Sequence, residues 1–172
     1  MAFLHMDGPL PVAGRRCASV SNDAPLAPSI RVYALAGYTG PFVVMGRSLG
    51  SASVLELISC YAREIDGLIV ESGFAYAEPL LRLLGIDMKA LGVTEEEGFR
   101  NVDKMRTFPK PTLVIHAEHD HIIPFTDGKA LYEACPAADK RLLMIPRANH
   151  NDIFARGIEP YMKAVKELTE KL

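Results

Sequence analysis

The sequence predicts an α/β fold, in which helices cover both faces of a mostly parallel sheet. Short, uniformly apolar runs alternate along the chain with longer runs of helical periodicity. Strands buried on both faces by helices have this apolar composition. The 172 residues, of which 49% are hydrophobic and 23% charged, suffice for one domain with a substantial core. A repeated strand–helix–strand order implies right-handed crossovers and therefore a parallel sheet.

The chain divides into an irregular start and a regular remainder. Residues 1–28 are predicted as an irregular segment, because residues 8–28 carry four prolines and no strand or helix periodicity. Residues 29–172 are predicted as the α/β core. Its four strands are expected at residues 41–45, 67–70, 111–116 and 141–145. Its helices are expected at residues 29–36, 49–63, 126–135 and 151–172. A small helical cap insertion is expected at residues 74–108, with helices near 79–84 and 94–106.

Composition excludes several classes of function. The formal net charge of −2 predicts no broad basic surface for nucleic acid. No run approaches the roughly 18–20 apolar residues of a membrane-spanning helix, so we expect a soluble protein that is not exported. The three cysteines, Cys17, Cys60 and Cys135, show no spacing pattern of a disulfide framework or a four-cysteine metal site. This pattern favours a cytoplasmic location.

The strongest motif is the G-x-S-x-G pentapeptide GRSLG at residues 46–50, between a predicted strand and a predicted helix. That context favours a sharp strand-to-helix turn that exposes the hydroxyl of Ser48 at the rim of the sheet. The backbone N–H of Leu49 is then placed to stabilise a developing oxyanion. The alternative is a tight turn whose serine only caps the helix. Arg47 is expected to be exposed and is assigned no role.

A base and an acid for this serine follow later strands. A serine hydroxyl needs a general base, and the base needs an orienting acid. Asp120 comes just after the strand expected at residues 111–116, and His150 just after the one at 141–145. Because the carboxyl ends of parallel strands meet at one edge of a sheet, we expect Ser48, Asp120 and His150 to converge.

These segments resemble the α/β-hydrolase superfamily, in particular its small-cap serine hydrolases related to esterases and prolyl-oligopeptidase-like peptidases. VVMGRSLGSA is similar to the nucleophile elbow of that group, HAEHDHIIP to its acid segment and ANHNDI to its histidine segment. The resemblance covers residues 38–172. It implies that Ser48 is the nucleophile, His150 the general base and then acid, and Asp120 the residue that fixes the imidazole tautomer. It also implies a small-molecule, acyl or peptidyl substrate, and neither cofactor nor metal.

The start of the chain departs from the family pattern. The family has a strand and a His-Gly-containing loop well before the elbow, and that loop donates a second oxyanion N–H. Here 47 residues precede Ser48, so we expect a hydrolase fold shortened at the N-terminus. Phe3-Leu4-His5 is a faint echo of that element, but Met6 stands where the family has glycine. We therefore expect impaired activity and a bare edge on the elbow strand, through which a homodimer could form.

Two other functions stay open from the sequence. The first is a non-catalytic scaffold with a hydrolase fold and an incomplete oxyanion hole. The second is a metal-dependent hydrolase, because HAEHDH at residues 116–121 resembles the metallo-β-lactamase-type pattern H-x-H-x-D-H, except that a glutamate replaces the middle histidine. Zinc could in principle bind the five polar side chains of this cluster, which are His116, Glu118, His119, Asp120 and His121.

The cap insertion offers apolar side chains with two interpretations. They either line an acyl pocket above Ser48 or form the cap's own core. The residues concerned are Phe74, Tyr76, Leu80, Leu81 and Leu84.

Overall fold

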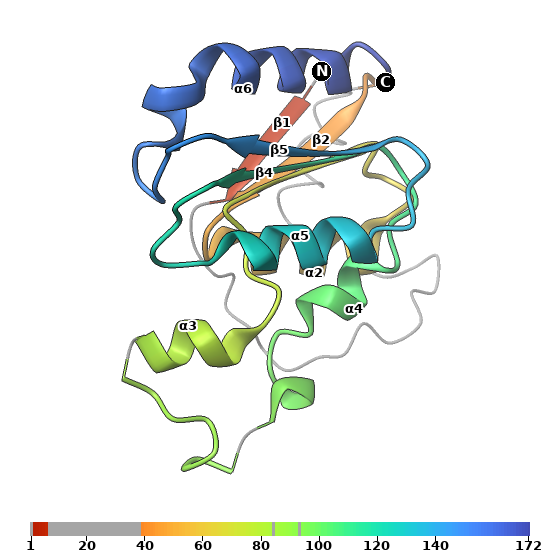
Figure 1. Ribbon diagram of the computed structural model, residues 1–172. Coiled ribbons are helices and arrows are strands. Elements are labelled where there is room, and N and C mark those ends of the chain that lie inside the picture. Colours follow the sequence, from red (N-terminus) through yellow and green to blue (C-terminus); the bar gives the residue numbers. More distant parts are fainter. Residues whose placement is uncertain (1, 7–38, 84, 93) are drawn as a thin grey trace.

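The computed structural model describes residues 2–6, 39–83, 85–92 and 94–172. Its centre is a sheet of five parallel strands, in the order β1-β2-β3-β4-β5 (Figure 1). The described residues do not include the helix expected at residues 29–36. They also do not include Cys17 or Leu84. The strands are β1 (Ala2–Met6), β2 (Phe42–Arg47), β3 (Gly67–Glu71), β4 (Thr112–Ala117) and β5 (Lys140–Ile145).

Helices cover both faces of the sheet, which confirms the predicted fold class. The helix α6 (Ile153–Thr169) lies on one face (Figure 1). On the other face lie α2 (Gly50–Tyr61), α4 (Asn101–Met105) and α5 (Phe125–Ala134). Successive strand residues alternate between the two cores, so that Val43 and Met45 face α6 whereas Val44 packs with α2. No helix of the described part of the chain is long and apolar enough to cross a membrane.

The first strand corrects the predicted start of the chain. Residues 2–6 form β1, which pairs in parallel with β2 from Ala2 opposite Phe42 to Met6 opposite Gly46. The expectation that residues 1–28 are irregular is therefore wrong for residues 2–6. The elbow strand β2 lies inside the sheet and not at its edge, so the reason for expecting a homodimer through that edge no longer holds. A five-residue strand whose partner is far along the chain leaves little signal in its own sequence.

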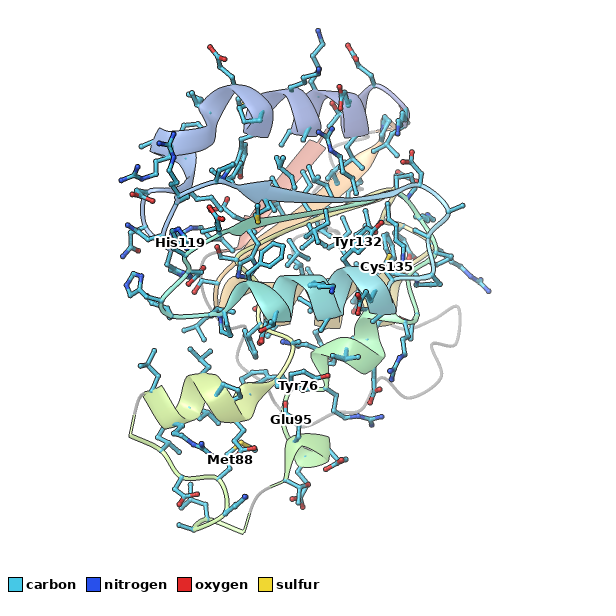
Figure 2. The ribbon with its side chains drawn as sticks, in the orientation of Figure 1. Tyr76, Met88, Glu95, His119, Tyr132 and Cys135 are labelled. Carbon is cyan, nitrogen blue, oxygen red and sulfur yellow. The ribbon has the colours of Figure 1, made fainter. Side chains whose placement is uncertain are left out.

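The insertion between β3 and β4 differs in detail from the prediction. It holds α3 (Ala77–Leu83), a 3₁₀ turn, η1 (Glu95–Glu97), and α4. The single helix expected at residues 94–106 is broken at Arg100, whose φ of 52° is left-handed. The carboxylate of Glu95, labelled in Figure 2, accepts hydrogen bonds of 2.7 and 3.1 Å from the first N–H groups of α3. Glu95 therefore ties α3 to the 3₁₀ turn.

The two described cysteines differ from each other. Cys135 is a free, buried thiol whose Sγ lies 3.8 Å from the carbonyl oxygen of Phe108. Cys60 is disulfide-bonded, which the cysteine pattern did not predict.

Candidate active site

The nucleophile elbow begins where β2 ends. Ser48 has a φ of 51°, and its N–H donates a 2.9 Å hydrogen bond to the carbonyl oxygen of Glu71 at the end of β3. Close approach of α2 to β2 requires glycine at position 46. A Cβ on Gly46 would lie 2.5 Å from both the oxygen of Gly50 and a methyl of Val54. The sharp turn therefore places Ser48 at the start of α2, as the motif predicts.

The carboxylate of Asp120 uses both of its oxygens. Oδ1 accepts hydrogen bonds from the N–H groups of Ile122 and Ile123, at 3.0 and 2.9 Å. Oδ2 lies 2.8 Å from Nδ1 of His150. Burial by itself would raise the pKa of Asp120, but the hydrogen bonds from His150 and the two N–H groups together lower it below its usual value. Asp120 is therefore an ionised acceptor at neutral pH.

His150 connects this acid to the serine. Its Nε2 lies 3.0 Å from Oγ of Ser48, and its side chain is 4% exposed. Because the Asp120 carboxylate can only accept, we assign the ring proton to Nδ1, which leaves the lone pair of Nε2 facing the serine. The structure thus brings Ser48, Asp120 and His150 together as one hydrogen-bonded chain.

Hydrogen bonds within and between loops hold the histidine in place. The N–H of Asn149 donates to the carboxylate of Asp152 at 2.6 Å, and the amide oxygen of Asn149 accepts the N–H of Asn151 at 2.8 Å. The histidine loop is also joined to the acid loop, since the N–H of Arg147 donates to Glu118 at 2.7 Å. This hydrogen bond therefore links the loop of the base to the loop of the acid.

Leu49 occupies the position predicted for an oxyanion donor. It is the N-cap residue of α2, directly after Ser48, and it is 40% exposed. At a helix N-terminus the first N–H groups have no partner within the helix, so they favour developing negative charge.

The HAEHDH cluster does not gather into a ligand set. The side chain of His116 is fully buried, with Nε2 2.9 Å from the carbonyl oxygen of Ile123. The side chain of His119, which Figure 2 labels, is 66% exposed. His121 is exposed as well. Within residues 2–6, 39–83, 85–92 and 94–172, no group of three or more His, Cys, Asp or Glu side chains could hold a metal ion.

Arg47 corrects a prediction. Its side chain is only 32% exposed and is bound by two partners, Glu71 and the backbone of His150. The sequence gives no sign of these contacts, since both partners are distant along the chain.

Apolar side chains of the insertion form a small core together with Ala52 of α2 and Ile123 of the acid loop. Phe74 and Leu80 are buried together with Met88 and Ile123, and Leu81 packs against them. Tyr76, in contrast, is 46% exposed (Figure 2). The interpretation as a core therefore holds for Phe74 and Leu80.

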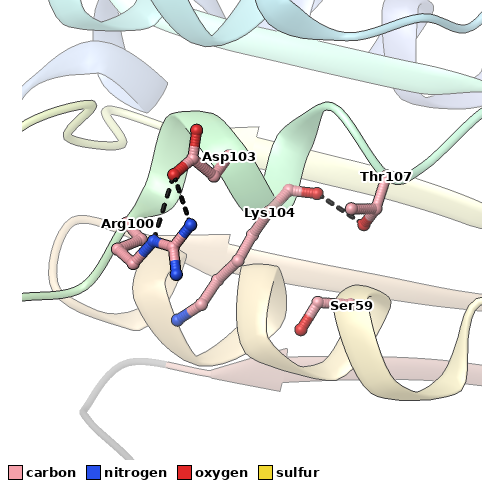
Figure 3. Close-up of a pocket in the computed structure, with 5 residues that line it drawn as sticks. All are labelled: Ser59, Arg100, Asp103, Lys104 and Thr107. Carbon is pink, nitrogen blue, oxygen red and sulfur yellow. Dashed lines mark hydrogen bonds and ion pairs between the residues drawn. The ribbon is translucent and has the colours of Figure 1, made fainter. Parts of the chain in front are cut away.

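A separate hollow lies between α2 and α4 (Figure 3). Its polar groups are already paired with one another or with neighbours. Arg100 binds Asp103 through two hydrogen bonds of 3.1 and 2.9 Å, and the hydroxyl of Thr107 donates to the carbonyl of Lys104. The ammonium of Lys104 lies 2.5 Å from Glu56. With its charges paired in this way, the hollow offers no reactive group to a ligand.

Comparison with known proteins places the fold and the motifs in a family. No protein-family model matches the chain. Alpha/beta hydrolase domain-containing protein 17C of Mus musculus is 33% identical over 120 residues, which are 68% of this chain and 35% of that protein. The human protein of the same name gives 33% identity over 68% of this chain and 34% of its own length. Est1E from Butyrivibrio proteoclasticus matches with a TM-score of 0.65 and 21% identity, over 83% of this chain and 67% of that one.

The chain belongs to the α/β-hydrolase superfamily. The esterase domain of a Rhodothermus marinus protein shares the α/β-hydrolase fold with it at a TM-score of 0.61 and 23% identity, over 79% of this chain and 63% of that one. This α/β-hydrolase chain spans about a third of the length of the curated relatives it matches.

Proposed function

We propose that this α/β-hydrolase chain is a serine hydrolase that cleaves an ester, thioester or amide through an acyl-enzyme on Ser48. One observation carries the proposal. Asp120, His150 and Ser48 form a continuous chain of contacts, at 2.8 and 3.0 Å, at the carboxyl ends of the strands. These distances lie within the hydrogen-bond range required of a base and its nucleophile.

The geometry supports a two-step reaction. In acylation, Nε2 of His150 takes the proton of Ser48 as Oγ forms a bond to the substrate carbonyl carbon, and the N–H of Leu49 donates to the resulting oxyanion. Collapse of this intermediate breaks the bond to the leaving group, which receives the proton from His150. In deacylation, water attacks the acyl carbon and gives a proton to His150, which returns it to Oγ as the acid product departs. Asp120 keeps a proton on Nδ1 of the imidazole throughout and stabilises the imidazolium that forms in each step.

The end of β1 bears on the second oxyanion donor. Because Met6 pairs with Gly46, the carboxyl end of β1 lies at the same rim as Ser48. In the family that this chain resembles, a second N–H comes from the segment that follows such a strand. Loss of one oxyanion donor costs about 100- to 1,000-fold in turnover. A chain without the second N–H should therefore turn over its substrate that much more slowly than one that has it.

Ester substrates have the strongest support among the three classes. The structures similar to this chain include an esterase domain, Est1E and a monoacylglycerol lipase. The exposed, apolar side chain of Leu49 beside Ser48 favours an uncharged acyl group. A p-nitrophenyl ester of a short fatty acid is therefore a suitable first substrate.

Labelling by a fluorophosphonate probe tests the proposal. We expect covalent labelling of the parent chain and loss of labelling in Ser48→Ala and His150→Ala. Ser59→Ala is the matched control, since the Ser59 hydroxyl donates to the carbonyl oxygen of Glu56 and lies 3.7 Å from Sγ of Cys60, both within α2. Ester turnover that is abolished by a chelator and unchanged in Ser48→Ala would favour the metal-dependent hydrolase. A folded chain that neither labels nor turns over ester would favour the non-catalytic scaffold.

A further inference from the structure

The second residue of the elbow motif binds the histidine loop. Nη2 of Arg47 donates a 2.7 Å hydrogen bond to the carbonyl oxygen of His150, and Nε donates one of 3.0 Å to Oε1 of Glu71. A guanidinium presents these donors in a rigid plane, so the two bonds together fix its orientation. Arg47 therefore joins the elbow to the loop that carries the proposed base.

Glu71 is the fixed point of this arrangement. It is 5% exposed and directly faces Arg47 in the register of β2 and β3. Its Oε2 accepts a 2.6 Å hydrogen bond from the hydroxyl of Tyr161 on α6, which is itself buried. Its backbone oxygen accepts the N–H of Ser48. A buried carboxylate needs such donors, and those of Arg47 and Tyr161 fix this one in place. The carboxylate thus holds Arg47, while the backbone oxygen of the same residue holds the serine turn.

We propose that Arg47, anchored by Glu71, is a positioning residue that sets the distance between the His150 imidazole and the Ser48 hydroxyl. The proposal rests on the proposed serine hydrolase function. The N–H of Ser48 binds the backbone oxygen of Glu71, and the side chain of Glu71 binds Arg47, which in turn binds the backbone of His150. One buried residue is therefore linked to both the nucleophile and the base. Among the described residues, Arg47 bonds to Glu71 and to the carbonyl oxygen of His150, and to none of the side-chain atoms of the proposed triad.

Kinetics of Arg47 variants test this role. A displacement of about 1 Å at a reacting pair costs about 100-fold, so we expect Arg47→Ala to lower kcat toward p-nitrophenyl acetate by about 10- to 100-fold. KM should stay within about twofold, because the role proposed for Arg47 is to position His150 and not to bind substrate. Arg47→Lys, and methylguanidinium added to Arg47→Ala, should each restore part of kcat. Arg141→Ala is the matched control, since Arg141 on β5 forms an exposed ion pair with Glu167 on α6. The kcat of this variant should equal that of the parent.

A spectroscopic readout separates this inference from the proposed function. The Nδ1–H of His150, hydrogen-bonded to Asp120, should give a far-downfield proton resonance that His150→Ala removes. We expect the resonance in Ser48→Ala and its broadening or loss in Arg47→Ala, whether or not the chain turns over ester. If the parent shows no turnover but Arg47→Ala loses the resonance, the hydrolase proposal fails and the positioning role stands. Unchanged kcat together with an unchanged resonance in folded Arg47→Ala overturns the positioning role.

Discussion

Replacing Asp120 by asparagine should disable the proposed base without displacing it. The oxygen of the new amide must stay on the side of Oδ1, because two N–H groups, of Ile122 and Ile123, point there. The NH₂ group then faces Nδ1 of His150 in place of Oδ2. Nδ1 must become the acceptor, which moves the ring proton to Nε2, where it points at the Ser48 hydroxyl.

The size of the effect follows from the loss of the basic nitrogen. An imidazole with its proton on Nε2 cannot accept the proton of Ser48, and the corresponding change in a serine triad lowers kcat by about 10⁴-fold. At about 1.36 kcal/mol per tenfold, this is about 5 kcal/mol of transition-state stabilisation. The fold should be retained, because the amide keeps both backbone hydrogen bonds of Asp120.

Steady-state hydrolysis of p-nitrophenyl acetate measures the loss of kcat, and thermal unfolding in parallel measures whether the fold is retained. Asp139→Asn is the control, since Asp139 forms an exposed ion pair with Lys171 far from the site. The pH dependence of the unfolding free energy gives a second readout of the Asp120 charge. Because the pKa of Asp120 is lowered in the fold, its charge stabilises the protein above about pH 3.9, and this stability is lost as the pH falls through the lower, folded pKa. Turnover by Asp120→Asn within tenfold of the parent would refute the tautomer reasoning.

Further predictions concern the packing around the site. Gly46→Ala should lower the free energy of unfolding by about 1–3 kcal/mol and weaken fluorophosphonate labelling, because the new methyl would lie 2.5 Å from the oxygen of Gly50; urea unfolding checks this. Burial lowers the pKa of His116, so the parent's stability should rise with pH up to about pH 6.5. His116→Gln should flatten that slope, whereas His119→Gln, at an exposed position, should not. Phe74→Ala should cost about 3–5 kcal/mol of stability by leaving a cavity in the core of the insertion, which urea unfolding also measures.

Much of the fold could be predicted because the central strands β2, β3 and β4 are buried on both faces. PFVVM, GLIV, PTLVIH and RLLMI are mostly apolar, and the bounds of each differ from those of an observed strand by at most two residues. The convergence of Ser48, Asp120 and His150 followed from topology alone, since each residue comes just after a parallel strand. What the spacing could not supply is the distance between their atoms.

Other elements failed for identifiable physical reasons. AFLHM becomes β1 only because β2 offers a partner across a long connection, and such a non-local pairing is invisible in five residues. The helix expected at residues 94–106 breaks between η1, which ends at its C-cap Gly98, and α4, whose N-cap Arg100 has a left-handed conformation. The polar side chains of the HAEHDH cluster include two separate pairs, His116 with Asp120 at 3.6 Å and His119 with Glu118 at 3.8 Å, so closeness in sequence did not give one shared site among the described residues.

The network of Arg47 shows where prediction from this sequence must stop. Arg47 lies two residues beyond Met45, on the face of β2 that α6 covers, and pairs with Glu71 because β2 and β3 adopt one particular register. A shift of a single residue would turn either side chain to the opposite face. Strands that are apolar on both faces carry no alternation from which that register can be read. Arg47 and Glu71 are the last residues of β2 and β3, beside the nucleophile. The link from the elbow to the base therefore depends on the register of these two strands. Shifting β3 by one residue would therefore disconnect His150 from Glu71 even with all three triad residues unchanged.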